Sequence, residues 1–276
     1  VFPVMGTMCS IVVAPSDVER LGTVAIESAM ASARGYLESM DHRFSHYTRE
    51  SEISRWLSGF HVSPDALADI DFVIKQCLRL RDESDGVFVH KNPVSGSVDT
   101  AGYVKGHAIR GAARAMQSRG LANFIVGVGG DSYCAGWATP DRPWRLAISD
   151  PARTHGVAAL VEATDMAVAT SGRAERGDHI WSGMGQASDA LSSFTVIGPD
   201  IAEADAYATI GFALGEAGVA WVALAPTAYQ WGGVHGALLG FFLYSVAVIV
   251  ALWYRPGAML RLNVWVLGAD VVFALF

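Results

Sequence analysis

Residues 124–137, which read FIVGVGGDSYCAGW, decide between two fold classes. The stretch 127–131 (GVGGD) is similar to the start of a G-x-G-x-x-G dinucleotide fingerprint, but the last glycine of that fingerprint is replaced by Ser132. The fingerprint also needs a helix after its glycines, whereas SYCAGW is typical of a strand. The glycines therefore predict a tight turn between two strands, either a turn whose bare backbone approaches a ligand or a plain hairpin.

Hydrophobic periodicity in the rest of the chain lacks the regular strand–helix alternation of a doubly wound sheet. One long helix is expected from a capping box of Ser16 and Glu19 to Met40, on an apolar stripe with steps of three and four. The other expected helices cover about 63–85, 103–119 and 201–215, and the other expected strands cover about 9–13, 144–148 and 194–197. This mixture favours an α+β fold.

The composition bounds the class of protein. The 276 residues are 51% hydrophobic and 17% charged, with a net charge of −7, which excludes a disordered chain. The negative charge and the lack of a Lys/Arg run argue against nucleic acid as a partner. Cys9, Cys77 and Cys134 are far apart and fit neither a disulfide framework nor a zinc ribbon. The length predicts two domains or subdomains.

The stretch 234–254 (VHGALLGFFLYSVAVIVALWY) contains no Asp, Glu, Lys or Arg and is long enough for a transmembrane helix. Arg255 and Arg261 follow it, which favours a cytoplasmic location for that end and an extracytoplasmic location for residues 1–231. Residues 262–276 are apolar too and could form a second span. We therefore expect a domain at 1–231 and a membrane-spanning tail at 232–276 in the cell membrane. The alternatives are a buried core helix or an out-of-frame tail on a soluble domain.

Asp205 and Thr209 are four residues apart on a predicted helix, so their oxygens project from one face. A carboxylate, a hydroxyl and nearby carbonyls suit Mg²⁺, although such pairs are also common on helix surfaces. His42 and His46 have the same spacing, but no third zinc ligand is evident nearby. His179 is expected in a loop, either as polar surface or as a general base.

Nine short motifs in chain order resemble the ApbE family, whose members are flavin transferases that use FAD to attach FMN to a protein Thr or Ser. They run along most of residues 1–224 and are as follows: MGT (5–7); Asp41, Phe44-Ser45, Tyr47 and SEI (51–53); DGVF (85–88); DTAGYVKG (99–106); GGD (129–131); Trp144, Ile148 and DP (150–151); ATSG (169–172); HI (179–180); and ADAYAT (204–209). GYVKG and ADAYAT look like the compact actinobacterial branch.

The resemblance implies an ApbE-like fold of two mixed subdomains, FAD as substrate and Mg²⁺ as cofactor. It implies that Mg²⁺ is held by Asp205, Thr209 and the backbone carbonyl of Gly102, and that His179 is the base for the acceptor hydroxyl, so that Asp205 and His179 are the catalytic residues. The residues that it places around FAD are Met5, Tyr47, Val87, Phe88, Asp99, Lys105, Gly130, Ser171, His179 and Ile180. AMP would be released, and the acceptor would be a flavoprotein subunit or domain of a membrane redox system.

The chain departs from the family pattern in three places. The family usually continues His-Ile with Asp-Pro-x-x-Gly, where this chain has WSGMG (181–185). After Phe88 the family often has Asp-Pro, whereas Val89-His90-Lys91 intervene here. The family's usual anchor is an N-terminal lipoprotein signal, so an apolar span at 234–254 is unexpected. Three hypotheses remain: a flavin transferase, a protein that binds FAD or hydrolyses it to FMN and AMP without an acceptor, and a membrane-anchored domain whose motifs are structural.

Overall fold

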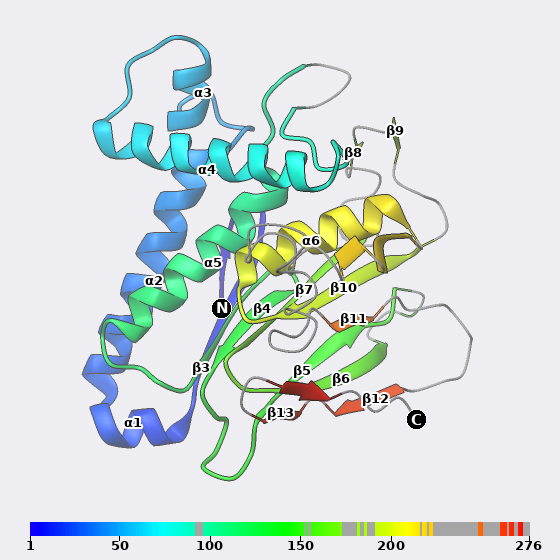
Figure 1. Ribbon diagram of the computed structural model, residues 1–276. Coiled ribbons are helices and arrows are strands. Elements are labelled where there is room, and N and C mark those ends of the chain that lie inside the picture. Colours follow the sequence, from blue (N-terminus) through cyan, green and yellow to red (C-terminus); the bar gives the residue numbers. More distant parts are fainter. Residues whose placement is uncertain are drawn as a thin grey trace.

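The computed structural model describes residues 1–91, 96–151, 153, 156–172, 181–182, 185–186, 191–215, 217–219, 221–222, 248–250, 260–263, 265–267 and 270–272. Figure 1 shows helices packed over a large sheet, with a smaller sheet below it. This mixed arrangement confirms the predicted α+β class. The predicted boundary between residues 231 and 232 stays a prediction.

The large sheet has seven strands in the order β1-β2-β3-β4-β7-β10-β11, and every neighbouring pair is antiparallel. Their bounds are β1 Phe2–Val4, β2 Thr7–Val13, β3 Phe124–Val128, β4 Asp131–Ala135, β7 Met166–Gly172, β10 Ser193–Gly198 and β11 Val248–Val250. Gly129 and Gly130 join β3 to β4 with φ angles of 56° and 88°, a conformation that suits glycine at both turn positions. The predicted turn is confirmed.

A second sheet has the order β12-β6-β5, in which β12 is Leu260–Asn263, β6 is Val157–Ala163 and β5 is Trp144–Ser149. Trp144, Leu146 and Ile148 alternate into a second hydrophobic core, as their spacing predicts. The Trp144 indole donates to the Ala135 carbonyl at 2.8 Å, which ties this sheet to β4. Two short pairs complete the described strands: β8 (Trp181–Ser182) with β9 (Gly185–Gln186), and β13 (Trp265–Leu267) with β14 (Asp270–Val272).

The helices are α1 (Pro15–Leu21), α2 (Thr23–Phe44), α3 (Glu52–Leu57), α4 (Pro64–Glu83), α5 (Ala101–Gln117) and α6 (Ile201–Leu214). The single helix expected from Ser16 is wrong, because Gly22 adopts a φ of 80° and separates α1 from α2. The capping box is also wrong, since α1 begins after Ala14 without a side-chain cap. α4 begins where the helix at about 63–85 was expected, and Ser63 caps it by accepting from the Ala66 amide at 3.2 Å.

The predicted membrane span lies largely outside the described residues. Its one described part, Val248–Val250, forms strand β11 against β10 rather than helix, which suits a run of β-branched residues. In the part of the chain that the structure describes, no helix is long and apolar enough to cross a membrane. The described residues of 262–276 belong to strands.

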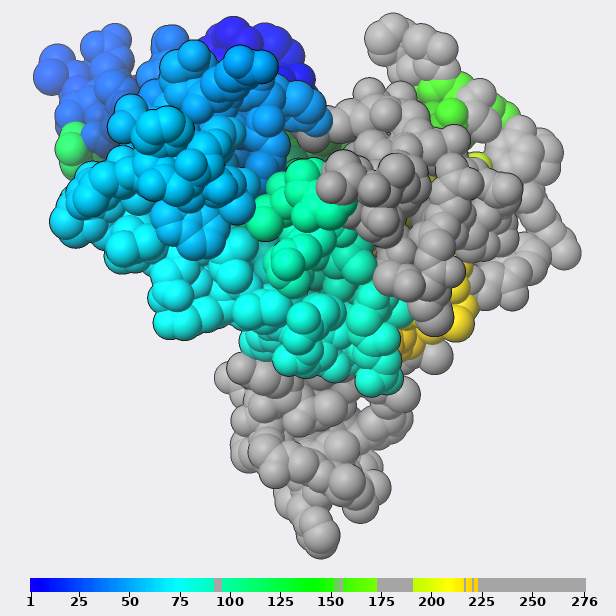
Figure 2. All heavy atoms as spheres, turned by 90° about the horizontal axis from the view of Figure 1, so that it is seen from above, coloured from blue at the N-terminus to red at the C-terminus, as the bar shows by residue number. Residues whose placement is uncertain are grey.

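Three helices cover the large sheet. α5 packs between α2 and α6 and contacts β3 and β4, while α6 contacts β7 and β10 (Figure 1). α3 and α4 form one side of the molecule, beside the residues near 100 that lead into α5 (Figure 2). α5 and α6 lie close together at Gly106, where an added Cβ would lie 2.5 Å from the Ile201 carbonyl oxygen and 2.9 Å from the Asp205 Cβ.

We predict that Gly106→Ala lowers the free energy of unfolding by about 1–3 kcal/mol, because the backbone of α6 cannot move away without disturbing its contacts with the sheet. Gly35→Ala is the matched control, since Gly35 lies exposed in α2 with open space around its Cβ position. That control is expected to gain about 0.5–1 kcal/mol. Urea unfolding measures both, and equal effects of the two substitutions would contradict the close helix contact.

Candidate active site

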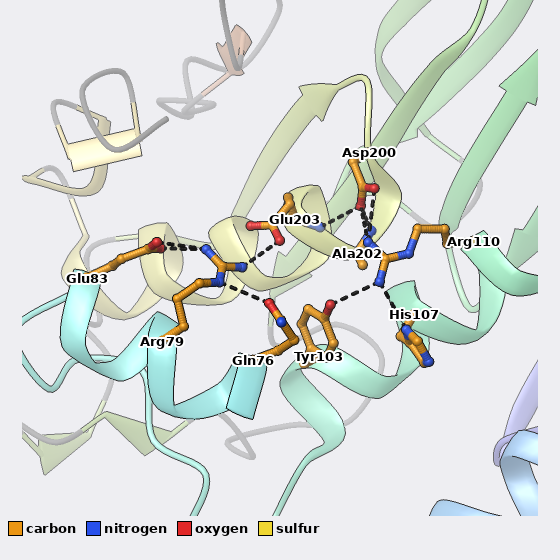
Figure 3. Close-up of polar contacts among 9 residues, drawn as sticks. All are labelled: Gln76, Arg79, Glu83, Tyr103, His107, Arg110, Asp200, Ala202 and Glu203. Carbon is orange, nitrogen blue, oxygen red and sulfur yellow. Dashed lines mark hydrogen bonds and ion pairs between the residues drawn. The ribbon is translucent and has the colours of Figure 1, made fainter. Parts of the chain in front are cut away.

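The first turn of α6 is fixed by its own cap and by an arginine from α4. Asp200 Oδ1 accepts from the amides of Ala202 and Glu203 at 2.8 and 3.1 Å, which caps the helix. Arg79 pairs with both carboxylate oxygens of Glu83, at 2.8 and 2.9 Å, and reaches Glu203 at 2.5 Å (Figure 3). This network fastens α4 to the start of α6.

A second arginine, on α5, holds the same helix end. Arg110 donates to Asp200 Oδ2 at 3.0 Å and to the Tyr103 hydroxyl at 3.0 Å (Figure 3). Burial and the Arg110 charge lower the pKa of His107 to about 4, so its neutral ring can accept from Arg110, 3.1 Å away. Two buried or half-buried guanidinium groups therefore set the position of α6, and with it the position of Asp205 one turn further along.

Asp205 is a buried carboxylate at the crossing of α5 and α6. Its Oδ2 accepts from the Gly106 amide at 2.8 Å, and its Oδ1 lies 3.6 Å from the Lys105 ammonium. The same ammonium lies 2.6 Å from Asp131 Oδ2, and the other oxygen of Asp131 accepts from the Thr170 amide at 2.9 Å. One lysine thus stands between two buried carboxylates that come from different elements.

The environment of Asp205 disfavours its charge. Burial raises the pKa of Asp205 to about 7, and the nearby charge of Asp131 and a hydrogen bond with it act in the same direction. Lys105 and the Gly106 amide oppose this shift but do not cancel it. A buried carboxylate with a raised pKa in a polar cluster is typical of a functional site, and a bound cation would favour its ionised form.

Gly102, Ser171 and Thr209 lie together beside this carboxylate. The Thr209 hydroxyl donates to the Asp205 carbonyl at 3.2 Å and lies 3.2 Å from the Ser171 hydroxyl. A Cβ built on Gly102 would lie 3.7 Å from the Thr209 methyl and 3.1 Å from the Phe88 ring. The structure therefore gathers the three residues predicted to bind the metal, together with Lys105, Ser171 and Phe88.

The donor set fits a small hard cation. Asp205 offers a carboxylate, Thr209 a hydroxyl, and Gly102 a backbone carbonyl with two lone pairs. The described residues hold no group of three or more His, Cys, Asp or Glu side chains that could bind a metal. A site with a single carboxylate and neutral oxygens suits Mg²⁺, which keeps several waters or substrate oxygens, better than it suits zinc.

The other residues predicted to bind FAD have varied surroundings. Met5 adopts a φ of 53° in the turn between β1 and β2, and its amide donates to Asp41 at 2.9 Å. Tyr47 is 96% exposed, whereas Val87 is buried.

Two further residues predicted to bind FAD lie next to the cluster in the chain. Asp99 accepts from the Ala101 amide at 2.9 Å at the start of α5. Gly130 is exposed in the turn that leads to Asp131. The assignments of all these residues to FAD stay predictions.

The sequence suggested functional roles for three histidines, His42, His46 and His179. His179, with its neighbour Ile180, lies outside the described residues, so its predicted role as base stays a prediction. His46 is half-buried with its Nε2 3.1 Å from the Thr100 hydroxyl and accepts from the Thr100 amide at 3.3 Å, which gives this nitrogen a structural partner. Burial lowers the pKa of His46. Among the residues that the structure describes, no cluster of possible zinc ligands forms around His42 and His46.

The sequence did not reveal the role of Asp131 or of the two arginines. Asp131 begins a strand directly after two glycines and belongs to the GGD motif, but neither feature indicated a partner for its side chain. Arg110 and Asp200 are 90 residues apart in the chain, so no local pattern could join them. These residues act through contacts between distant elements.

Comparisons with known proteins identify the family. The model of the ApbE family matches residues 89–230, just over half of the chain, so the chain belongs to the ApbE family. A FAD:protein FMN transferase from Klebsiella pneumoniae is 31% identical over 145 residues, which cover 49% of this chain and 41% of that protein. The corresponding Vibrio cholerae protein is 36% identical over 76 residues, which cover 27% and 23%.

Solved structures support the fold. Flavin Transferase ApbE from Vibrio cholerae has a TM-score of 0.65 at 23% identity and covers 80% of this chain and 88% of that chain. An ApbE protein from Thermotoga maritima has a TM-score of 0.64 at 20% identity and covers 87% and 89%. In the sequence comparison, the chain spans about two fifths of the length of the Klebsiella protein.

We predict that Arg110→Gln lowers the free energy of unfolding by about 1–3 kcal/mol, because it removes charge-assisted bonds to the cap of α6 and to Tyr103. Arg81→Gln is the matched control, since Arg81 pairs with Asp82 on the exposed surface. We expect that control to change stability by less than about 0.5 kcal/mol. Urea unfolding of both variants checks this, and equal losses would contradict a specific role for Arg110.

We predict that Asp205→Asn stabilises the metal-free protein at about pH 8 by roughly 1–3 kcal/mol, and by much less at about pH 5. Because burial raises the pKa of Asp205 from 3.8 to about 7, the folded protein binds more protons than the unfolded chain between those values. Stability from this group is therefore lost as the pH rises from 3.8 to about 7, and the loss is complete at pH 8, whereas asparagine stays neutral. Urea unfolding in EDTA at both pH values measures this, and a gain independent of pH would contradict it.

Proposed function

We propose that the protein transfers FMN from FAD to a Thr or Ser hydroxyl of an acceptor flavoprotein, with Mg²⁺ as cofactor and AMP as the second product. The observation that carries this proposal is the cluster of Lys105, Asp131, Asp205 and Thr209 at the crossing of α5 and α6. The names of the curated relatives, FAD:protein FMN transferase, support the activity.

The reaction requires attack of the acceptor oxygen on the phosphorus on the FMN side of the FAD pyrophosphate. The bond between that phosphorus and the bridging oxygen breaks, and AMP leaves with the electron pair. Asp205, Thr209 and the Gly102 carbonyl would hold Mg²⁺, which would neutralise the charge that builds on the phosphate oxygens. Lys105 adds a fixed positive charge at the same place. The acceptor hydroxyl must lose its proton, and His179 is the base proposed for that step.

The buried surroundings serve the same chemistry. Asp205 and Asp131 are almost fully buried, and Lys105 is 22% exposed, so their electrostatic interactions are screened less than they would be in water. The arginines at the start of α6 hold Asp205 in place before a substrate arrives, which limits the reorganisation needed during the reaction. Val87, Phe88 and Asp99 are proposed to contact FAD beside this cluster.

We also propose that the acceptor belongs to a membrane redox system and that the apolar tail at 232–276 tethers the catalytic part on the extracytoplasmic side. Two features of the sequence support this proposal. The stretch 234–254 carries no charged residue, and two arginines follow it.

The test is FMN transfer by the full chain in detergent, given FAD, MgCl₂ and an acceptor domain with an exposed Asp-x-x-Thr/Ser-Gly-Ala-Thr segment. We predict an FMN adduct by mass spectrometry and AMP in equal amount, both abolished by EDTA. Asp205→Ala should lower the rate at least about a hundredfold, because it removes the charged ligand of the cofactor. Asp71→Asn, on an exposed pair with Lys75, is the control that should retain the full rate.

Other outcomes would replace the proposal. AMP without labelling of the acceptor would indicate FAD hydrolysis, and tight FAD binding with neither product would indicate a binding protein. The segment 181–185, whose sequence departs from the family pattern, would then be the first to replace with the family's sequence.

A further inference from the structure

We propose that Asp131 is a positioning residue that holds the Lys105 ammonium away from Asp205 and so keeps the Asp205 carboxylate available to a divalent cation. This inference rests on the proposed function, because it takes Asp205 as a metal ligand.

Asp131 is held rigidly. It is the first residue of β4, directly after the Gly129-Gly130 turn, and its side chain is fully buried. Its Oδ1 accepts from the Thr170 amide on β7 at 2.9 Å, at the place where β4 and β7 pair. Its Oδ2 therefore has a fixed position, and that position is 2.6 Å from the Lys105 Nζ.

Lys105 is the movable member of the cluster. Its ammonium sits on a flexible stem of four carbons, and it lies 2.6 Å from Asp131 but 3.6 Å from Asp205. Both carboxylates attract it, so its position depends on the balance between them. If Asp131 lost its charge, the ammonium would be drawn toward Asp205, which is the other carboxylate within 4 Å in the described ion pairs.

The two oxygens of Asp205 are not equivalent. Oδ2 accepts from the Gly106 amide at 2.8 Å, and this bond faces α5 at the helix crossing. Oδ1 is the oxygen that faces the Lys105 ammonium. A cation that binds Asp205 through Oδ1 would compete with Lys105 for the same atom. An ammonium held by Asp131 leaves this oxygen to the metal while its charge remains close enough to act on a bound phosphate.

The test is a double-mutant cycle of metal binding on the full chain, with Mn²⁺ titrated by electron paramagnetic resonance without FAD. The four proteins are the unmodified chain, Asp131→Asn, Lys105→Met and the double variant. We expect Asp131→Asn to weaken Mn²⁺ binding about tenfold or more. In the Lys105→Met background, the same change should alter binding by less than about twofold, since no ammonium remains to compete. Asp71→Asn should leave binding unchanged.

Two results would overturn the inference. Equal weakening by Asp131→Asn in both backgrounds would mean that Asp131 acts on the cation directly through its charge. No weakening in either background would mean that it has no part in metal binding. Circular dichroism checks the fold, and if Asp131→Asn does not fold, Asp131→Ser retains an acceptor for the Thr170 amide and enters the cycle in its place.

The same four proteins are assayed for FMN transfer, so that the two proposals can fail separately. A cycle with the expected pattern in a protein that transfers no FMN would refute the proposed function and leave the positioning role in place. Transfer by the unmodified protein with equal losses of Mn²⁺ binding in both backgrounds would refute the positioning role alone. Absence of Mn²⁺ binding in the unmodified chain would refute both.

Discussion

The hydrogen bond from the Gly106 amide to the buried Asp205 carboxylate is the contact on which the site depends. It requires α5 and α6 to approach so closely that only a glycine fits at the crossing, where an added Cβ would lie 2.5 Å from the Ile201 carbonyl oxygen. That approach in turn places Gly102 and Lys105 on α5 beside Asp205 and Thr209 on α6. Arg79 on α4 and Arg110 on α5 bind the first turn of α6 and its cap, and so hold α6 in this position.

Charge balance is the second constraint at the site. Two buried carboxylates share one ammonium, and burial together with the nearby charge of Asp131 raises the pKa of Asp205. A divalent cation would oppose that shift, because it favours the ionised form of Asp205. The buried charges of the cluster therefore lower the stability of the metal-free fold. They also prepare a site for a cation and a phosphate, as expected where function and stability compete.

Local patterns predicted the parts of this arrangement that depend on neighbours in the chain. The glycine turn, the start of α4 near residue 63 and the alternation at Trp144 follow from short-range chemistry, and the spacing of Asp205 and Thr209 placed two oxygens on one helix face. The break at Gly22 was missed because the apolar stripe continues through it, and only the backbone angle shows it. Asp131 and Arg110 were missed because their partners lie far away in the chain. Lys105 and Gly102 were found only through the resemblance to a family, since neither has a pattern of its own.

The central claim is that Asp205, Thr209 and the Gly102 carbonyl form one cation site at the helix crossing. The most direct test is an anomalous difference map from crystals of the protein grown with MnCl₂ and FAD. The account predicts a single strong peak at about 2.0–2.3 Å from Asp205 Oδ1 and from the Thr209 hydroxyl, with Lys105 still paired to Asp131. A metal peak elsewhere would contradict this claim. So would a map with no metal beside Asp205 Oδ1 and with the Lys105 ammonium in contact with that oxygen.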